Sequence, residues 1–220
     1  MELNDLTVIM CTLNKLPEGW VKYHKQILLE AIGDYPLITI SKKPMDWGLN
    51  ITQDGEESPA NLYWQMLKGL KLVTTPYIAM VDDDTLYPRE HFTSFRPPLN
   101  TFAYNMTRWA IFTWGRPFYF YRNRISNCLL IAPRELAIKI LEERFKKYSN
   151  KFSYHTGREL TANDGDKGYI EFFTYEPVIN FYHIFGIDPL EKRRRKRPWP
   201  IQAFDLPKWG RAEDLVKHFK

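Results

Sequence analysis

The stretch Tyr77–Pro88 reads YIAMVDDDTLYP, in which five apolar or aromatic residues run directly into three aspartates. A short apolar run bounded by polar residues is typical of a buried strand, which we predict at Tyr77–Val81. In an open parallel sheet, ligands bind beyond the carboxyl ends of the strands. Asp82, Asp83 and Asp84 therefore lie where such a fold presents its functional groups.

The residues before this stretch alternate between apolar runs and segments with helical spacing. We predict strands at Thr7–Thr12 and Pro36–Ser41, and helices at Trp20–Ile32 and Ala60–Val73. With the strand at Tyr77–Val81 this gives a β-α-β-α-β order, which predicts a parallel sheet covered by helices. The predicted fold class is α/β, with a mostly parallel central sheet flanked by helices.

The chain after Pro88 is less regular, and its first part is rich in aromatic residues and proline. We predict strands and helices, in chain order, at Asn127–Ala132 (strand), Pro133–Tyr148 (helix), Tyr169–Tyr175 (strand), Val178–Tyr182 (strand) and Ala212–Lys220 (a short amphipathic helix). We expect one domain over residues 1–220.

The composition is that of a globular chain with a sizeable core, because 44% of the 220 residues are hydrophobic and 15% are aromatic. No apolar run reaches the roughly 18 residues of a membrane span, and the start lacks the pattern of a signal peptide. We therefore expect no integral membrane segment and a cytoplasmic location. Cys11 and Cys128 lie inside apolar runs, which indicates buried free thiols. The oligomeric state cannot be read from these features.

Three adjacent carboxylates repel one another, which costs stability unless a cation or hydrogen-bond donors offset it. Oxygen ligands of this kind suit Mn²⁺ or Mg²⁺. The alternative is a solvated acidic turn, but the position of the aspartates directly after an apolar strand favours a metal site.

Here the sequence resembles a known family. Val81–Pro88 resembles the Asp-x-Asp region of glycosyltransferases of the GT-A fold (family 2-like), and Thr7–Asn14, TVIMCTLN, resembles their first strand and nucleotide-binding turn. The resemblance covers about the first 90 residues. It implies a Rossmann-like GT-A domain and a metal-dependent transferase, hexosyl or pentosyl. Such an enzyme takes its sugar from a nucleotide-sugar donor, with a UDP-sugar expected, and moves it to an acceptor hydroxyl. Inversion is the expected outcome, and retention is the alternative, because Arg197-Pro198-Trp199 resembles a segment of the retaining branch. It also implies a nucleotide-sugar-binding half (1–90), an acceptor and catalytic half (91–188) and a basic tail (189–220).

The resemblance also implies roles for single residues. Thr12 and Asn14 would lie against the base and ribose, and Asn61 would provide a polar donor contact ahead of the Asp-x-Asp strand. Asp82 would approach the ribose or sugar, with Asp83 as the variable middle residue beside the donor. Asp84 would bind the metal together with Asp82.

Two later segments complete the implied site. Thr161–Asp166 reads TANDGD, where the inverting branch of the family places its general base. Asp164 is our first choice and Asp166 our second, although Asn163 stands where an acid is common and an Asn-Asp-Gly turn without chemistry is the alternative. His183 opens a His-x-x-Gly pattern that resembles the segment completing the metal site; the alternative is a histidine packed among aromatic neighbours.

Aromatic and basic residues crowd the stretch Arg108–Arg124. By the resemblance this is the acceptor side, where Trp114 would stack and Arg116 would bind phosphate, although we expect about half of its aromatic residues to be core. Lys192–Arg197 reads KRRRKR, within a net charge of +5. This run, with Arg193, Arg194 and Arg195 at its centre, is a solvated face, a lid over the donor diphosphate, or a site for a polyanion such as DNA or an anionic membrane surface.

Two other functions remain open. A nucleotidyltransferase also uses carboxylates and a metal, but it would carry a Gly-rich phosphate loop, and Cys11–Gly19 contains only Gly19. A non-catalytic nucleic-acid-binding protein would explain the basic run but not the aspartates. The acceptor also stays open between a glycan and a hydroxylated base in DNA of the phage type.

Overall fold

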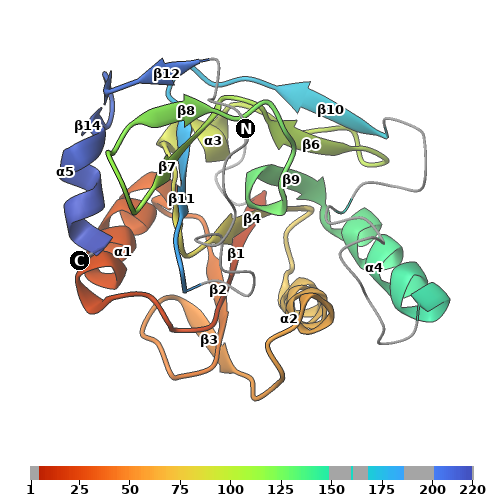
Figure 1. The fold of residues 1–220 in the computed structure, drawn as a ribbon. Coiled ribbons are helices and arrows are strands. Elements are labelled where there is room, and N and C mark those ends of the chain that lie inside the picture. Colours follow the sequence, from red (N-terminus) through yellow and green to blue (C-terminus); the bar gives the residue numbers. More distant parts are fainter. Residues whose placement is uncertain (1–4, 149–159, 161–167, 186–200, 220) are drawn as a thin grey trace.

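The computed structural model describes residues 5–148, 160, 168–185 and 201–219. Seven strands form a central sheet in the order β10-β6-β9-β4-β1-β2-β3 (Figure 1). Their bounds are β1 Leu6–Thr12, β2 Leu37–Ser41, β3 Leu49–Thr52, β4 Tyr77–Asp82, β6 Phe102–Asn105, β9 Leu130–Pro133 and β10 Tyr169–Phe172. Strand β9 is antiparallel to both of its neighbours, whereas the other described pairs of this sheet are parallel. The predicted α/β class with a mostly parallel sheet is confirmed.

The middle strands of the sheet are buried and mostly apolar, as expected of parallel strands covered on both faces. All seven residues of β1 are buried. Strand β4 runs beside it in a register that places Asp82 opposite Cys11. The carboxyl ends of β1 and β4 therefore meet at one edge of the sheet, with the three aspartates at that edge.

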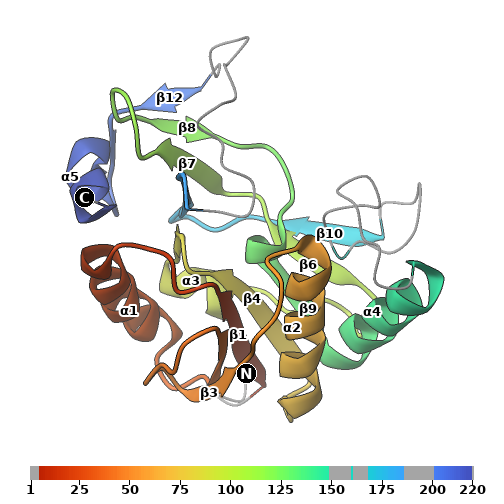
Figure 2. The same cartoon turned by 60° about the horizontal axis from the view of Figure 1, so that its bottom comes forward.

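Helices cover both faces of the sheet. Helix α1 (Glu18–Ile32) links β1 to β2, and α2 (Pro59–Leu72) links β3 to β4. These crossovers run in opposite directions along the sheet, so right-handed connections place the helices on opposite faces, as Figure 2 shows. Helix α3 (Arg89–Thr93) packs beside α1, and α4 (Arg134–Tyr148) packs beside α2.

A second sheet stands next to the aspartates, with strand order β12-β8-β7-β11-β5. Its strands are β5 Thr85–Leu86, β7 Arg108–Phe112, β8 Tyr119–Tyr121, β11 Val178–Tyr182 and β12 Gln202–Ala203. Strand β5 directly follows the aspartates and pairs antiparallel with β11. The aspartate loop is therefore one of the chain connections between the two sheets.

The described C-terminal segment packs onto α1. A short pair, β13 (Asp205–Leu206) with β14 (Gly210–Arg211), leads into α5 (Ala212–Val216) and a 3₁₀ turn at Lys217–Phe219. The ring of Phe219 stacks on Trp20 of α1, with centroids 4.0 Å apart. This helix confirms the predicted amphipathic end of the chain.

The predicted elements up to β4 agree with the structure within a residue or two. Two later predictions differ: residues Asn127–Leu129 form a 3₁₀ turn before β9, and β10 ends at Phe172, before the exposed side chains of Phe173 and Tyr175. Cys11 and Cys128 are free and buried, as predicted. Within the described ranges, no helix combines the length and the hydropathy that crossing a membrane would require.

Candidate functional site

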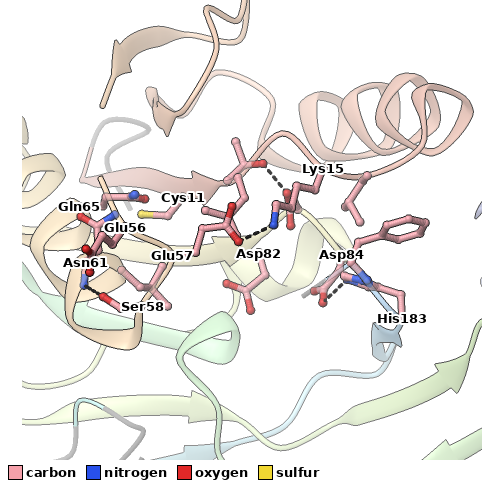
Figure 3. A pocket seen from close by; sticks show the side chains of 16 residues that line it. Cys11, Lys15, Glu56, Glu57, Ser58, Asn61, Gln65, Asp82, Asp84 and His183 are labelled. Carbon is pink, nitrogen blue, oxygen red and sulfur yellow. Dashed lines mark hydrogen bonds and ion pairs between the residues drawn. The ribbon is translucent and has the colours of Figure 1, made fainter. Parts of the chain in front are cut away.

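A pocket opens at the carboxyl ends of β1 and β4, between the loop after β1, the start of α2 and the end of β11 (Figure 3). The side chains that line it are Cys11, Thr12, Leu13, Lys15, Leu16, Glu56, Glu57, Ser58, Asn61, Leu62, Gln65, Asp82, Asp83, Asp84, His183 and Phe185. Thr12, Asn61, the three aspartates and His183 were predicted as site residues, and the fold brings them to this one pocket.

One side of the pocket, which we call the His183 wall, consists of Asp84, His183 and Phe185. The carboxylate of Asp84 accepts from Thr85 Oγ1 at 2.8 Å and from Asn180 Nδ2 at 3.0 Å. Its other oxygen lies 3.2 Å from His183 Nε2. Both oxygens of Asp84 are thus fixed by neighbours, so the carboxylate has a defined direction before any ligand arrives.

A second layer of hydrogen bonds stands behind Asp84. Asn180 is 4% exposed and Arg108 is 5% exposed. The Arg108 guanidinium donates to Asn180 Oδ1 at 2.6 Å, while Asn180 Nδ2 also donates to Thr85 Oγ1 at 2.9 Å. A buried cation is therefore connected to Asp84 through a single amide, which offsets part of the carboxylate repulsion.

The protonation of His183 follows from its neighbours. The Phe185 amide N–H donates to His183 Nδ1 at 3.1 Å, so Nε2 carries the proton of the neutral ring and donates to Asp84. Burial lowers the pKa of His183, but the hydrogen bond to Asp84 and the charges of Asp84 and Asp83 outweigh burial and raise it above its ordinary value. The ring is further held by stacking on Phe219, at a centroid distance of 5.7 Å.

Asp83 is turned toward β1 and α1. Its carboxylate accepts from Thr12 Oγ1, and its backbone carbonyl accepts from Trp20 Nε1 at 2.8 Å. Burial and the neighbouring Asp84 raise the pKa of Asp83 to about 6. His24 on α1 anchors the same loop, since its Nε2 lies 3.0 Å from the Thr85 carbonyl.

The opposite side of the pocket, which we call the α2 wall, consists of Ser58, Asn61 and Gln65. Ser58 is the N-cap of α2 and accepts from the Asn61 amide at 3.1 Å, with Pro59 in the first turn. Figure 3 shows this wall facing the pair Asp84–His183, with Asp82 between them. An ion pair of Lys15 with Glu57 joins the loop after β1 to the segment before α2.

A divalent cation is the group that the sequence implies here. Within the described residues, no group of three or more His, Cys, Asp or Glu side chains is placed to hold a metal ion. Asp82, Asp84 and His183 are therefore not assembled into a three-ligand site, since Asp82 ends β4 beside Cys11 while Asp84 turns to His183. Asp84 fits a cation that takes its other ligands from a diphosphate and water, as Mg²⁺ does. His183 would bind a cation through Nε2 only with its proton moved to Nδ1, which would break the contact with the Phe185 amide.

Other predicted residues lie elsewhere. Asn14 adopts a left-handed backbone conformation (φ 53°) and accepts from the Lys43 amide at 2.9 Å. Its side chain lines a smaller adjoining cavity with Thr12 and Asp83. Trp114 and Arg116 are in the β7–β8 turn, where Trp114 packs edge-on against Phe112 and the exposed Arg116 lies over the Phe204 ring, 4.9 Å from its centroid. Neither lines the pocket.

Five predicted residues lie outside the described residues: Asp164, Asp166, Arg193, Arg194 and Arg195. Their assignments as general base or phosphate-binding residues stay predictions.

The structure adds residues that the sequence analysis did not assign. Asn180 is the polar residue of an otherwise apolar or aromatic strand, VINFY, and a polar residue inside such a run is the signal that could have identified it. Gln65 is buried on α2 among apolar residues, which is a similar signal. Arg108 was grouped with the acceptor side, but it is buried behind Asp84 instead.

No protein-family model and no curated protein sequence matches this chain. Among solved structures, the chain is similar to a glycosyltransferase involved in glycosylation of the major capsid of PBCV-1, with 11% identity, 80% of this chain and 91% of that chain covered, and a TM-score of 0.44. It is also similar to a mutant Drosophila β1,4-galactosyltransferase 7 in complex with manganese, UDP-Gal and xylobiose, with 13% identity, coverage of 87% and 77%, and a TM-score of 0.44.

A third similar structure is the bifunctional IspDF of Campylobacter jejuni, with 13% identity over 63% of this chain and a TM-score of 0.41. The chain spans 43% of the length of that protein.

Proposed function

We propose that the protein is a metal-dependent glycosyltransferase that moves a hexosyl or pentosyl group from a nucleotide-sugar, with a UDP-sugar expected, to an acceptor hydroxyl with inversion. The observation that supports this most is Asp84, a pre-oriented carboxylate at the carboxyl ends of β1 and β4 in a pocket shared with His183.

The charge of the pocket supports a cation-dependent reaction. Five carboxylates line it, from Glu56, Glu57, Asp82, Asp83 and Asp84, against a single lysine. A diphosphate entering such a pocket meets repulsion at short range, and a divalent cation between the two charges removes that repulsion. The cation would be held by Asp84, and by His183 in the tautomer whose proton is on Nδ1; when bound, it would neutralise the charge that develops on the leaving diphosphate.

The remaining roles rest on the position of the described residues and, for the general base, on the family resemblance. Thr12 orders the loop after β1, since its hydroxyl accepts from the Asn14 amide at 3.0 Å and donates to Asp83. We assign this loop to the nucleoside, Asp82 to the ribose or sugar, and the general base to Asp164, with Asp166 as the alternative. A general base typically contributes about 10²–10⁴-fold to turnover.

Donor binding and donor chemistry test this function together. Thermal shift with UDP, GDP and ADP and their sugar conjugates, with Mn²⁺ and with chelator, should show stabilisation that needs both nucleotide and metal. Slow hydrolysis of the bound nucleotide-sugar in Mn²⁺ should release nucleoside diphosphate. Release of pyrophosphate from a nucleoside triphosphate instead would identify a nucleotidyltransferase, and no metal-dependent nucleotide binding at all would overturn the proposal.

A further inference from the structure

Gln65 on the α2 wall is a buried amide without a partner. Its side chain lines the pocket and is only 2% exposed. Within the part of the chain that the structure describes, this amide forms no hydrogen bond. Buried side-chain amides are nearly always bonded to protein or ordered water. Its two polar atoms are not among the fully buried, unbonded atoms of the described chain, so they are open to the pocket, where water or a ligand supplies their partner.

Asn61 offers open donors one helical turn before Gln65, on the same face of α2. Its Oδ1 accepts from Gln53 Nε2 at 2.6 Å. Gly55 packs against the amide so closely that a Cβ there would come within 2.7 Å of Nδ2. The side chain is thus held in place, while Nδ2 has no acceptor among the described residues.

The two amides suit one chemical class of ligand. Together they present donors and an acceptor without charge, which complements hydroxyl groups because each hydroxyl both donates and accepts. A nucleobase would also gain from a flat ring on which to stack. The aromatic residue among the described lining residues is Phe185, on the His183 wall. The base therefore fits the His183 side, and a sugar fits the α2 wall.

The neighbouring charges narrow this class further. Glu56 and Glu57 precede α2 and line the same pocket, and Asp82 lies between the two walls. The lysines near this end, Lys15 and Lys42, are both paired with Glu57. A carboxylate on the sugar would meet acidic groups here, and among the described residues the two nearby lysines already have an acidic partner.

We infer that the α2 wall is the sugar subsite of the donor, that it takes a neutral, hydroxyl-bearing sugar and rejects a uronate, and that Gln65 determines this specificity. This inference rests on the proposed function. It assigns an orientation to the donor, with the sugar at Gln65 and the diphosphate at Asp84.

Calorimetric binding with Mn²⁺ tests the inference. The ligands are UDP, UDP-glucose, UDP-galactose and UDP-glucuronate, with the corresponding guanosine ligands if the protein binds GDP instead. Wild type should bind at least one neutral UDP-hexose more tightly than UDP, and UDP-glucuronate no more tightly than UDP. Gln65→Met has nearly the same size without hydrogen-bonding groups, and it should lose about five- to tenfold in UDP-hexose affinity while UDP affinity stays unchanged. Gln26→Leu, at an exposed position of α1, is the matched control and should change neither.

The outcomes separate the inference from the proposed function. If neither UDP nor GDP binds, the proposed function is wrong. If UDP binds but Gln65→Met weakens UDP and UDP-hexose equally, the base occupies the α2 wall and the inference is overturned. The inference is also overturned if the folded Gln65→Met variant keeps the wild-type difference in affinity between UDP-hexose and UDP. The wild-type comparison needs no variant, and tighter binding of UDP-glucuronate than of the neutral hexoses would refute the charge argument by itself.

Discussion

The two walls of the pocket differ in how their polar side-chain atoms are hydrogen-bonded. On the His183 wall, Asp84 is bonded through both carboxylate oxygens and His183 through both ring nitrogens. On the α2 wall, the Gln65 amide and Asn61 Nδ2 have no partner within the described residues. The first wall is ordered by the protein itself, and the second is left to be completed by a ligand.

The difference has a physical reason. Charged groups that act on a leaving diphosphate work best when they are oriented in advance, because no free energy is then spent on reorganisation during the reaction. Groups that select a ligand must stay available to it, and the polar atoms of Gln65 and Asn61 are not among the buried atoms of the described chain that lack a hydrogen-bond partner. The protein fixes the first wall with its own hydrogen bonds and leaves the second open to water or a ligand.

Asp84→Ala should have the largest effect on the His183 wall. We expect transfer to fall by at least about 10²–10³-fold and metal-dependent donor binding to be lost. The free energy of unfolding should fall by about 1–3 kcal/mol, because Asn180 and Thr85 lose an acceptor. From the sequence alone, relief of carboxylate repulsion suggested a gain in stability; the hydrogen bonds of Asp84 reverse that sign.

Glu56→Ala is the matched control for Asp84→Ala, since it removes the same charge from the same pocket. Within the described residues, Glu56 forms no hydrogen bond or ion pair, and it is exposed. Stability should therefore change by less than about 0.5 kcal/mol. Equal losses of metal-dependent binding in both variants would mean that net charge, and not the orientation of Asp84, holds the cation.

Asn180→Ala tests the layer behind Asp84. We expect metal-dependent donor affinity to fall by about 10–100-fold, the usual cost of losing a group that orients a metal ligand. Asn50→Ala is the control, because Asn50 donates to Thr39 and Ser41 away from the pocket. Both variants should lose similar stability in chemical denaturation, but only Asn180→Ala should lose donor affinity. A Mn²⁺-dependent affinity equal to wild type in Asn180→Ala would show that Asp84 needs no support.

Much of the fold could be predicted from the sequence because its first half follows simple periodic patterns. The runs at β1, β2 and β4 are buried on both faces, so hydrophobicity alone reveals them. Strand β3 (LNIT) is half exposed and has no such run. Strands β6, β7 and β8 lie in a segment whose aromatic, proline and glycine content obscures any period.

The site could be predicted only in part, for a related reason. Position after an apolar strand identifies Asp82, Asp83 and Asp84, since a parallel sheet fixes where its strands end. The contact of His183 with Asp84 spans 99 residues and came from the family resemblance. Nothing local indicates that Arg108 turns inward to Asn180, because that contact depends on how β7 and β11 pair in the second sheet.

Trp20→Phe should have a smaller effect. The substitution keeps the ring that stacks on Phe219 but removes the donor to the Asp83 carbonyl, so stability should fall by about 0.5–1.5 kcal/mol. Trp209→Phe is the control, because it removes an equivalent bond to the Pro177 carbonyl, 2.7 Å long. Thermal unfolding should rank the two variants together, whereas only Trp20→Phe should weaken donor binding. Donor binding that is equally reduced in both would indicate a general loss of rigidity.

Lys15→Met addresses the ion pair that joins the loop after β1 to the segment before α2 and should have the smallest effect. The Lys15–Glu57 pair is partly exposed, with 42% and 31% of the two side chains accessible, and exposed pairs contribute about 0–1 kcal/mol. We therefore expect unfolding to change little. Lys15 is, however, the lysine that lines the described pocket, so donor affinity should fall a few-fold at low ionic strength, and the difference from wild type should shrink as salt screens the charge.

Lys25→Met breaks the comparable pair with Asp46 outside the pocket and should leave donor affinity unchanged at every salt concentration. If Lys15→Met instead destabilised the fold, the α2 wall would depend on the loop after β1 for its position, and helix α2 alone would not account for that wall.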